Sequence, residues 1–166
     1  MLRSKDFYLK NIYDVNGKKI GVVEDIYIDF YNQRVVGFKC SSLSFLNKND
    51  YIDIEDVIEL DDEVVVYSRK QGSGLSFKSI KNLNIVDING IKKGVLEDII
   101  VDSNNYNIKG IVASSGIFDR LIKGKEIFLL EQCILGDEYI LYTGKDNIEF
   151  KTMIHDMEKK NDSAKA

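Results

Sequence analysis

Histidine is almost missing from this 166-residue chain. His155 is the single one, and it lies in a polar C-terminal stretch. Catalysis by a nucleophile and base, or metal binding through histidine, needs a second ligand or an ordered nucleophile beside it, which a lone histidine in a tail does not meet. We therefore expect no catalytic residues, no metal site, no cofactor and no enzyme activity. Proline and tryptophan are absent, and the abundance of Lys, Asn and Ile is typical of an AT-rich bacterial genome.

Cysteine is also scarce. Cys40 and Cys133 lie in apolar stretches without CxxC spacing, which predicts buried free thiols and a reducing compartment, because unpaired cysteine behaves as a small hydrophobe. A regulatory disulfide joining the two halves is the alternative. No run approaches the roughly 18 apolar residues of a membrane helix, and the start lacks the apolar core of a signal peptide. We expect a soluble cytoplasmic protein without a membrane span.

Positive charge is in deficit. The net charge is −4, which disfavours nucleic acid as a partner, because affinity for phosphate comes from clustered Lys and Arg. The acids are concentrated between residues 50 and 63, where there is no Lys or Arg. They are Asp50, Asp53, Glu55, Asp56, Glu59, Asp61, Asp62 and Glu63. We favour a solvated face, and leave open a divalent-cation patch or a docking surface for a basic partner.

What the sequence does contain is an internal repeat. Residues 15–46 align with residues 88–119 at a spacing of 73, with 14 identities in 32 positions, among them Glu24-Asp25 and Glu97-Asp98. Later in each copy, Asp61 to Tyr67 matches Gly136 to Tyr142. We predict a first domain at 1–70, a flexible Gly/Ser-rich linker at 71–76, a second domain at 77–146, and a tail at 147–166.

Within a copy the signals are those of strands. Asn16-Gly17 is a hairpin dipeptide, and strands are expected at 20–30, 34–41, 51–54 and 63–67, with a counterpart of the second at 107–113. Short strands separated by polar turns predict an all-β barrel or small sandwich. Phe150, Met153, Ile154 and Met157 recur at helical spacing, which predicts a short amphipathic C-terminal helix.

The repeated run N-G-x-x-x-G-x-[VL]-E-D-I-x-[IV]-D, followed by a turn, a glycine-containing strand and a Ser-rich loop, resembles the PRC-barrel domain. The resemblance covers about residues 5–68 and 78–143, which is nearly the whole chain. It implies two tandem small antiparallel β-barrels of about six strands each. It also implies a role in holding other macromolecules and no catalytic residues. The family includes the photosynthetic reaction centre H subunit and the ribosome maturation factor RimM.

Each Glu-Asp pair is interpreted as structural, with the Asp accepting backbone hydrogen bonds at a bulge or turn and the Glu solvated, because neighbouring strand residues point to opposite faces. The loops at 41–49 and 114–125 share Ser-Ser-x-x-Phe, and loops on a rigid scaffold often carry binding residues. The predicted partner-binding residues are Phe45, Leu46, Ile117, Phe118 and Arg120. Capping of each barrel by its own Phe is the alternative.

The sequence therefore favours a non-enzymatic cytoplasmic adaptor that binds another protein through its two modules, with self-association of the chain left open. A ribosome- or RNA-associated assembly factor is the first alternative. It needs a basic face, for which the candidates are Lys92, Lys93, Arg120, Lys123 and Lys125. A small-molecule or cation-binding module, which needs a polar pocket, is the second alternative.

Overall fold

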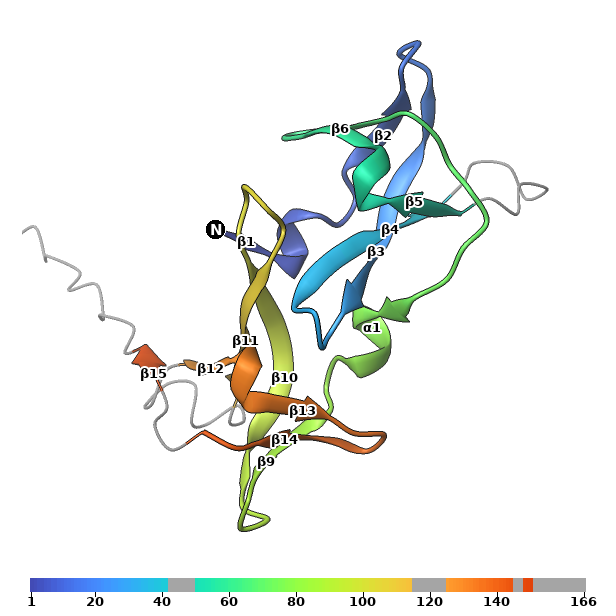
Figure 1. The fold of residues 1–166 in the computed structure, drawn as a ribbon. Coiled ribbons are helices and arrows are strands. Elements are labelled where there is room, and N and C mark those ends of the chain that lie inside the picture. The colour runs from blue at the N-terminus through green and yellow to red at the C-terminus, as the bar shows by residue number, and fades with distance from the viewer. Residues whose placement is uncertain (42–49, 115–124, 145–147, 151–166) are drawn as a thin grey trace, which may run out of the picture.

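The computed structural model describes residues 1–41, 50–114, 125–144 and the backbone of 148–150, and all structural statements below concern these residues. The chain forms two β-sheets, one from each repeat (Figure 1). The first repeat supplies β2 (Asn11–Asp14), β3 (Lys19–Asp29), β4 (Arg34–Ser41), β5 (Tyr51–Asp53), β6 (Val57–Leu60) and β7 (Val64–Val66). The second supplies β9 (Asn84–Asp87), β10 (Lys92–Val101), β11 (Ile108–Ser114), β12 (Lys125–Leu129), β13 (Cys133–Leu135), β14 (Tyr139–Tyr142) and β15 (Ile148–Phe150). The all-β prediction is confirmed.

Both sheets follow the same plan. The strand order is β5-β4-β3-β2-β7-β6 in the first and β13-β14-β9-β10-β11-β12-β15 in the second. In the first sheet the end strands β5 and β6 are joined directly by the short 3-10 helix η2 (Ile54–Asp56), so the sheet must curl back on itself. η3 (Leu130–Gln132) joins β12 to β13 in the same way. The sheets are antiparallel, as predicted, apart from one pair in each, because β2 pairs with β7, and β9 with β14, in parallel.

The opening hairpin of each repeat is built around an aspartate and a glycine. The Asp14 carboxylate accepts hydrogen bonds from the backbone N–H groups two and four residues later, at 2.9 and 3.0 Å, and Gly17 takes a φ of +75°. Asp87 and Gly90 repeat the arrangement, with a φ of +76° at the glycine. Because Asn16 does not share the positive φ, the turn is a type I turn closed by a left-handed glycine, rather than the two-residue turn that the dipeptide suggests.

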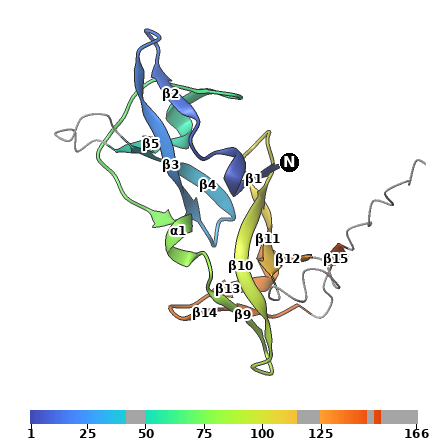
Figure 2. The ribbon, with the colours of Figure 1, turned by 180° about the vertical axis from the view of Figure 1, so that it is seen from behind.

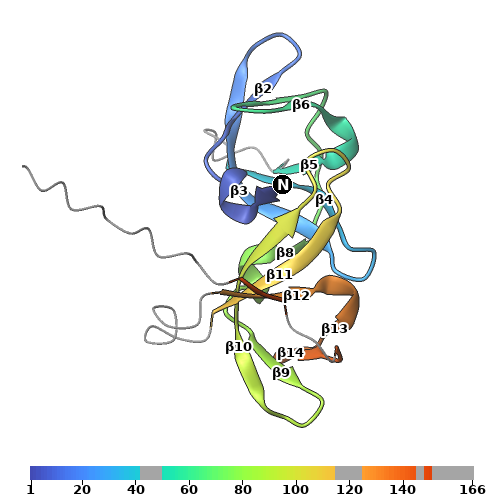
Figure 3. The same cartoon turned by 90° about the vertical axis from the view of Figure 1, so that its left-hand side faces the viewer.

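Two further strands of two residues each cross between the repeats. β1 (Leu2–Arg3) pairs with β10 of the second sheet, and β8 (Leu75–Ser76) pairs with β3 of the first sheet. The short helices that follow them, η1 (Ser4–Asp6) and α1 (Phe77–Ile80), pack on β10 and β3 respectively. Figure 2 shows β1 beside the yellow β10 and the green α1 beside β3, and Figure 3 shows the two sheets from the side.

The crossing strands change the predicted domain organisation. Residues 71–76 were expected to form a flexible linker, yet residues 75 and 76 are a strand of the first sheet, and the backbone at Lys70 pairs with Tyr51. Gly72 and Gly74 lie against the rings of Tyr51 and Tyr27. The segment therefore packs on the first sheet. The remaining boundaries stay a proposal.

One continuous apolar core links the two halves. It includes buried residues of both sheets and of both crossing segments, such as Phe7, Phe38, Phe77 and Phe128. The rings of Phe7 and Phe38 lie 5.7 Å apart between centroids. Ile80 in α1 is also buried, so the helix covers part of β3 that would otherwise face water. Residues 148–150 form β15 beside β12, and residues 151–166, which include most of the predicted C-terminal helix, lie outside the described residues.

Candidate functional site

The residues predicted to bind a partner, which are Phe45, Leu46, Ile117, Phe118 and Arg120, lie outside the described residues, as does His155. Their role stays a prediction. The same holds for Lys123. The repeated Glu-Asp pairs, in contrast, are fully described, and they occupy the most strongly shared position of the two sheets.

Each Glu-Asp pair lies at a β-bulge. Val23 pairs with Cys40 and Asp25 with Lys39, so Glu24 is the extra residue of the first bulge; Glu97 is the extra residue of the second. The bulge turns the aspartate inward: Asp25 is 3% exposed and Asp98 is 7% exposed. Each accepts a hydrogen bond from the next backbone N–H at 2.8 Å, which confirms the predicted structural role of the aspartate.

The glutamates are less solvated than predicted. Glu24 pairs with Lys39 at 3.2 Å, and Glu97 pairs with Lys125 at 2.7 Å, each within its own sheet. The lysines are not at matching positions of the repeat, because Lys39 is in β4 and Lys125 is in β12. Each repeat has therefore acquired its own neutralising partner for the extra residue of the bulge.

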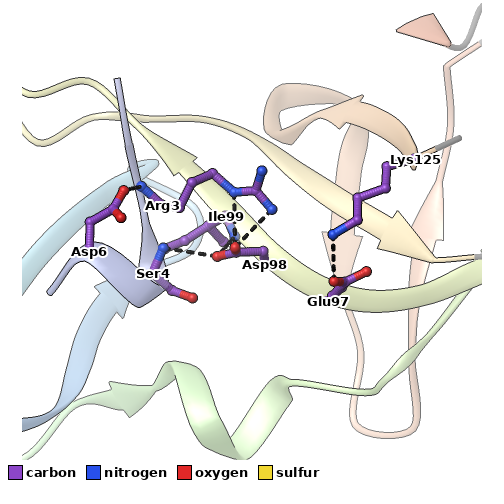
Figure 4. Close-up of polar contacts among 7 residues, drawn as sticks. All are labelled: Arg3, Ser4, Asp6, Glu97, Asp98, Ile99 and Lys125. Atoms are coloured by element: carbon purple, nitrogen blue, oxygen red, sulfur yellow. Dashed lines mark hydrogen bonds and ion pairs between the residues drawn. The ribbon is translucent and has the colours of Figure 1, made fainter. Parts of the chain in front are cut away.

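Asp98 holds the N-terminal segment (Figure 4). Its carboxylate accepts a hydrogen bond from the Ser4 backbone N–H at 2.8 Å, and hydrogen bonds from Arg3 Nε and Nη2 at 2.9 and 2.8 Å. Asp6 in turn accepts a hydrogen bond from the Arg3 backbone N–H at 2.7 Å, which fixes the start of η1. Ionised acceptors form the stronger class of hydrogen bonds, so this carboxylate is a substantial anchor.

Asp25 holds the equivalent segment of the second repeat. Its carboxylate accepts hydrogen bonds from the Ser76 hydroxyl and, at 3.3 Å, from the Lys78 backbone N–H. The Tyr8 hydroxyl donates to the same carboxylate at 3.4 Å, and Lys78 Nζ lies 5.2 Å from the centroid of the Tyr8 ring. The two aspartates therefore do the same job with different donors: a guanidinium for Asp98 and a serine hydroxyl for Asp25.

Tyr8 lies where the two clusters meet. Burial, followed by the negative charge of Asp25, raises its pKa well above the ordinary value of 10.0, and the charge of Asp98 adds to the effect. The hydroxyl is therefore neutral over the physiological range and is a donor to Asp25. This arrangement binds segments together, and it leaves both carboxylates engaged by internal donors.

The acidic stretch at 50–63 is partly neutralised from within. Lys70 lies 3.2 Å from Asp53 and 3.3 Å from Asp56, and Asp53 also caps η2 by accepting from the Glu55 N–H at 3.1 Å. Backbone and side-chain donors outweigh burial and lower the pKa of Asp53. The acids left exposed are Glu55, Glu59, Asp61, Asp62 and Glu63.

The proposed basic face is also partly neutralised. Of its described members, Lys93 pairs with Asp87 at 3.3 Å and Lys125 with Glu97, while Lys92 is exposed. Because these two lysines pair with carboxylates, their positive charge is largely neutralised and contributes little to binding a phosphate backbone.

Within the described part of the chain, no group of three or more His, Cys, Asp or Glu is placed to hold a metal ion. Cys40 and Cys133 are free and buried, as predicted, and burial raises the pKa of the Cys133 thiol to about 12. No described helix is long and apolar enough to span a bilayer.

The crossing segments were missed from sequence, although a signal was present. Extending the repeat alignment backwards at the same spacing matches Leu2 with Leu75, Lys5 with Lys78, and Ile12 with Ile85. The identity of Leu2 and Leu75 marks both opening strands as members of the repeat.

Comparison with known proteins agrees with this architecture. A search of curated proteins finds no match. Residues 1–71 and 73–144 each match the family model of the PRC-barrel domain, so the second match begins before β8, as the first begins before β1. With both repeats matched and the crossing segments included in each, this chain belongs to the PRC-barrel family and carries two copies of its domain.

Proposed function

We propose that this protein is a non-enzymatic cytoplasmic adaptor that binds another protein through its two PRC-barrel modules. One observation carries the proposal: the repeats share the buried aspartates at their mutual contacts, and they differ on the hairpin that follows η2 or η3. The shared residues, such as Asp25 and Asp98, are buried and occupied internally. Part of the variation between the repeats therefore lies on a surface that an external partner can reach.

The β6–β7 and β13–β14 hairpins expose different side chains on equivalent pairs of strands. In the β6–β7 hairpin the exposed residues include Glu59 and Asp61. In the β13–β14 hairpin the position of Glu59 is taken by Ile134, which is 49% exposed, and Tyr139 nearby is 46% exposed. Neither set of side chains is required by the shared fold, since the two modules form the same sheet with different residues at these positions. Ile58 is also exposed in the first hairpin, and Asp137 and Glu138 are exposed in the second, so each hairpin presents a mixed surface and the first is the more acidic. Two unlike surfaces of this kind fit a scaffold that engages a protein at two distinct places.

The experiment is affinity purification with the full chain from extracts of its native cell, using surface variants. One variant carries Glu59→Lys and Asp61→Lys, a second carries Ile134→Ser and Tyr139→Ser, and Lys19→Ser at an exposed position is the control. We expect each hairpin variant to lose bound protein that the control retains, and binding through the acidic hairpin to weaken at high salt. An unchanged set of bound proteins in both hairpin variants would contradict the proposal.

A second experiment separates the adaptor from the ribosome- or RNA-associated alternative. That alternative requires free positive charge, and the pairing of Lys93 and Lys125 with carboxylates counts against it. Co-sedimentation of the chain with ribosomes at low salt, lost in a Lys92→Glu variant, would favour it over the adaptor.

A further inference from the structure

The contacts between the repeats obey an approximate two-fold symmetry. In the first crossing pair, Leu2 lies opposite Val101 and Arg3 opposite Ile100. In the second, Leu75 lies opposite Ile28 and Ser76 opposite Tyr27. Adding the repeat spacing of 73 to Leu2 gives Leu75, and subtracting it from Val101 gives Ile28. Arg3 and Ile100 give Ser76 and Tyr27 in the same way. The opening segment of each repeat therefore pairs with the long strand of the other repeat, in the same register.

A third contact lies on the symmetry axis itself. Arg34 and Asn107, which are equivalent residues, face each other in an isolated antiparallel bridge. The flanking hydrogen bonds are reciprocal: the Val35 N–H donates to the Tyr106 carbonyl at 3.0 Å, and the Ile108 N–H donates to the Gln33 carbonyl at 2.6 Å. A residue meets its own equivalent only across a two-fold axis, as in an isologous interface between identical subunits.

We propose that each module is a docking site for the opening segment of another module of the same kind, and that this recognition, rather than the covalent connection, holds the two modules together. The site consists of the edge of the long strand, β3 or β10, that the opening segment pairs with, and of the buried aspartate at the bulge of that strand. Its ligand is an extended segment with leucine in the added strand, a side-chain donor at the next position, and a free backbone N–H one or two residues later.

The chemistry of the site fits this ligand. Strand addition supplies backbone hydrogen bonds that accept many sequences, and a side chain beside the added strand supplies the selectivity. Here the selective group is Asp98 for Arg3 and Ser4, and Asp25 for Ser76 and Lys78. The covalent connection between the modules at 71–74 lies on the first sheet, where Gly72 and Gly74 contact tyrosine rings. It does not contribute to the pairing of β1 with β10.

The test is to cut the connection in the folded, full-length protein. A recognition sequence for a site-specific protease is inserted between Gly72 and Ser73, the protein is purified intact, and it is then cleaved under native conditions. We expect the two fragments to stay together at micromolar concentration, with the mass of the intact 19.0 kDa chain in size-exclusion chromatography with light scattering. Separation of the fragments at that concentration would overturn the proposal.

Variants show whether the aspartate site is responsible. In the cleaved protein, Asp98→Asn and, independently, Arg3→Ala should raise the dissociation constant of the fragments at least about tenfold, because each removes a charge-assisted contact. Glu97→Gln is the matched control: it removes the neighbouring charge, whose partner Lys125 belongs to the same module, and should leave the constant unchanged.

Two independent variants keep the result interpretable if one of them fails to fold. Arg3 is partly exposed and lies outside the sheet of its own module, so Arg3→Ala preserves the intact fold even if Asp98→Asn does not, and circular dichroism of the uncut proteins checks this. In the double variant the two increases in the dissociation constant should not multiply, since both changes remove the same contact between Arg3 and Asp98. Additive effects, or equal weakening by Glu97→Gln, would overturn the proposed recognition by Asp98.

Discussion

Removing the Asp25 carboxylate should destabilise both modules together. Asp25 lies in the first module, but two of its hydrogen-bond donors, Ser76 and Lys78, belong to the opening segment of the second. The substitution Asp25→Ala therefore weakens β3 at its bulge and releases the segment that covers it. Because one apolar core spans both modules, we expect a single cooperative unfolding transition that moves as a whole.

The magnitude follows from the donors that lose their acceptor. The Ile26 N–H is buried and bonds to the carboxylate at 2.8 Å, and the Lys78 N–H is partly buried. A buried donor left without a partner costs about 1–3 kcal/mol, so two such donors give a loss of about 2–4 kcal/mol in the free energy of unfolding, allowing for partial access to water. In a chain of this size that corresponds to a decrease in Tm of roughly 4–16 °C.

The assay is urea unfolding followed by circular dichroism and by tyrosine fluorescence, with Glu24→Gln as the control. Glu24 precedes Asp25, carries the same charge and is 41% exposed in its side chain, so the loss of its ion pair with Lys39 should cost less than about 1 kcal/mol. A loss below about 0.5 kcal/mol for Asp25→Ala, or one no larger than that of Glu24→Gln, would refute the reasoning. Two separated transitions in the wild-type protein would refute the coupling.

Three further predictions concern single positions. Cys40 and Cys133 should react with a thiol reagent only after unfolding, because burial raises both pKa values; rapid reaction of the folded protein would contradict this. The Ile91 N–H, followed by other donors, lowers the pKa of Asp87 below 3.8, so its stabilising contribution is present above pH 3.8 and is lost as the pH falls through the lowered value; carbon-detected NMR titration measures the midpoint. Gly37→Ala should cost about 1–3 kcal/mol in thermal unfolding, because a Cβ would collide with the Ile52 carbonyl, and a cost below 0.5 kcal/mol would contradict this.

The features predicted correctly from sequence are those with a local signal. The strand expected at 34–41 is β4, with the same bounds, because a polar turn precedes it and a Ser-rich loop follows it. The aspartates at the bulges were identified by their repetition and by the opposite facing of neighbouring strand residues. Both kinds of inference use only residues that are close in sequence or related by the repeat.

The features that were missed depend on distant contacts. A strand of two residues, such as β1 or β8, shows no periodicity, and its pairing is decided by the edge it meets. The parallel pairing of β2 with β7 likewise joins the two ends of a module. The helix predicted from the spacing of Phe150, Met153, Ile154 and Met157 stays a prediction, because residues 151–166 lie outside the described part of the chain and only Phe150 is placed, in β15 beside β12.

The exchange of opening segments has a consequence for the order of events on the ribosome. Arg3 is made before its partner Asp98, which is 95 residues later in the chain. The edge of β3 can be filled soon after synthesis of residues 75–76, whereas β1 has no place to bind until β10 has been made. The pairing of β1 therefore has to wait for residues that are translated much later, and such distant closure is slow in folding. Until then the early segment is exposed to chaperones and to neighbouring nascent chains.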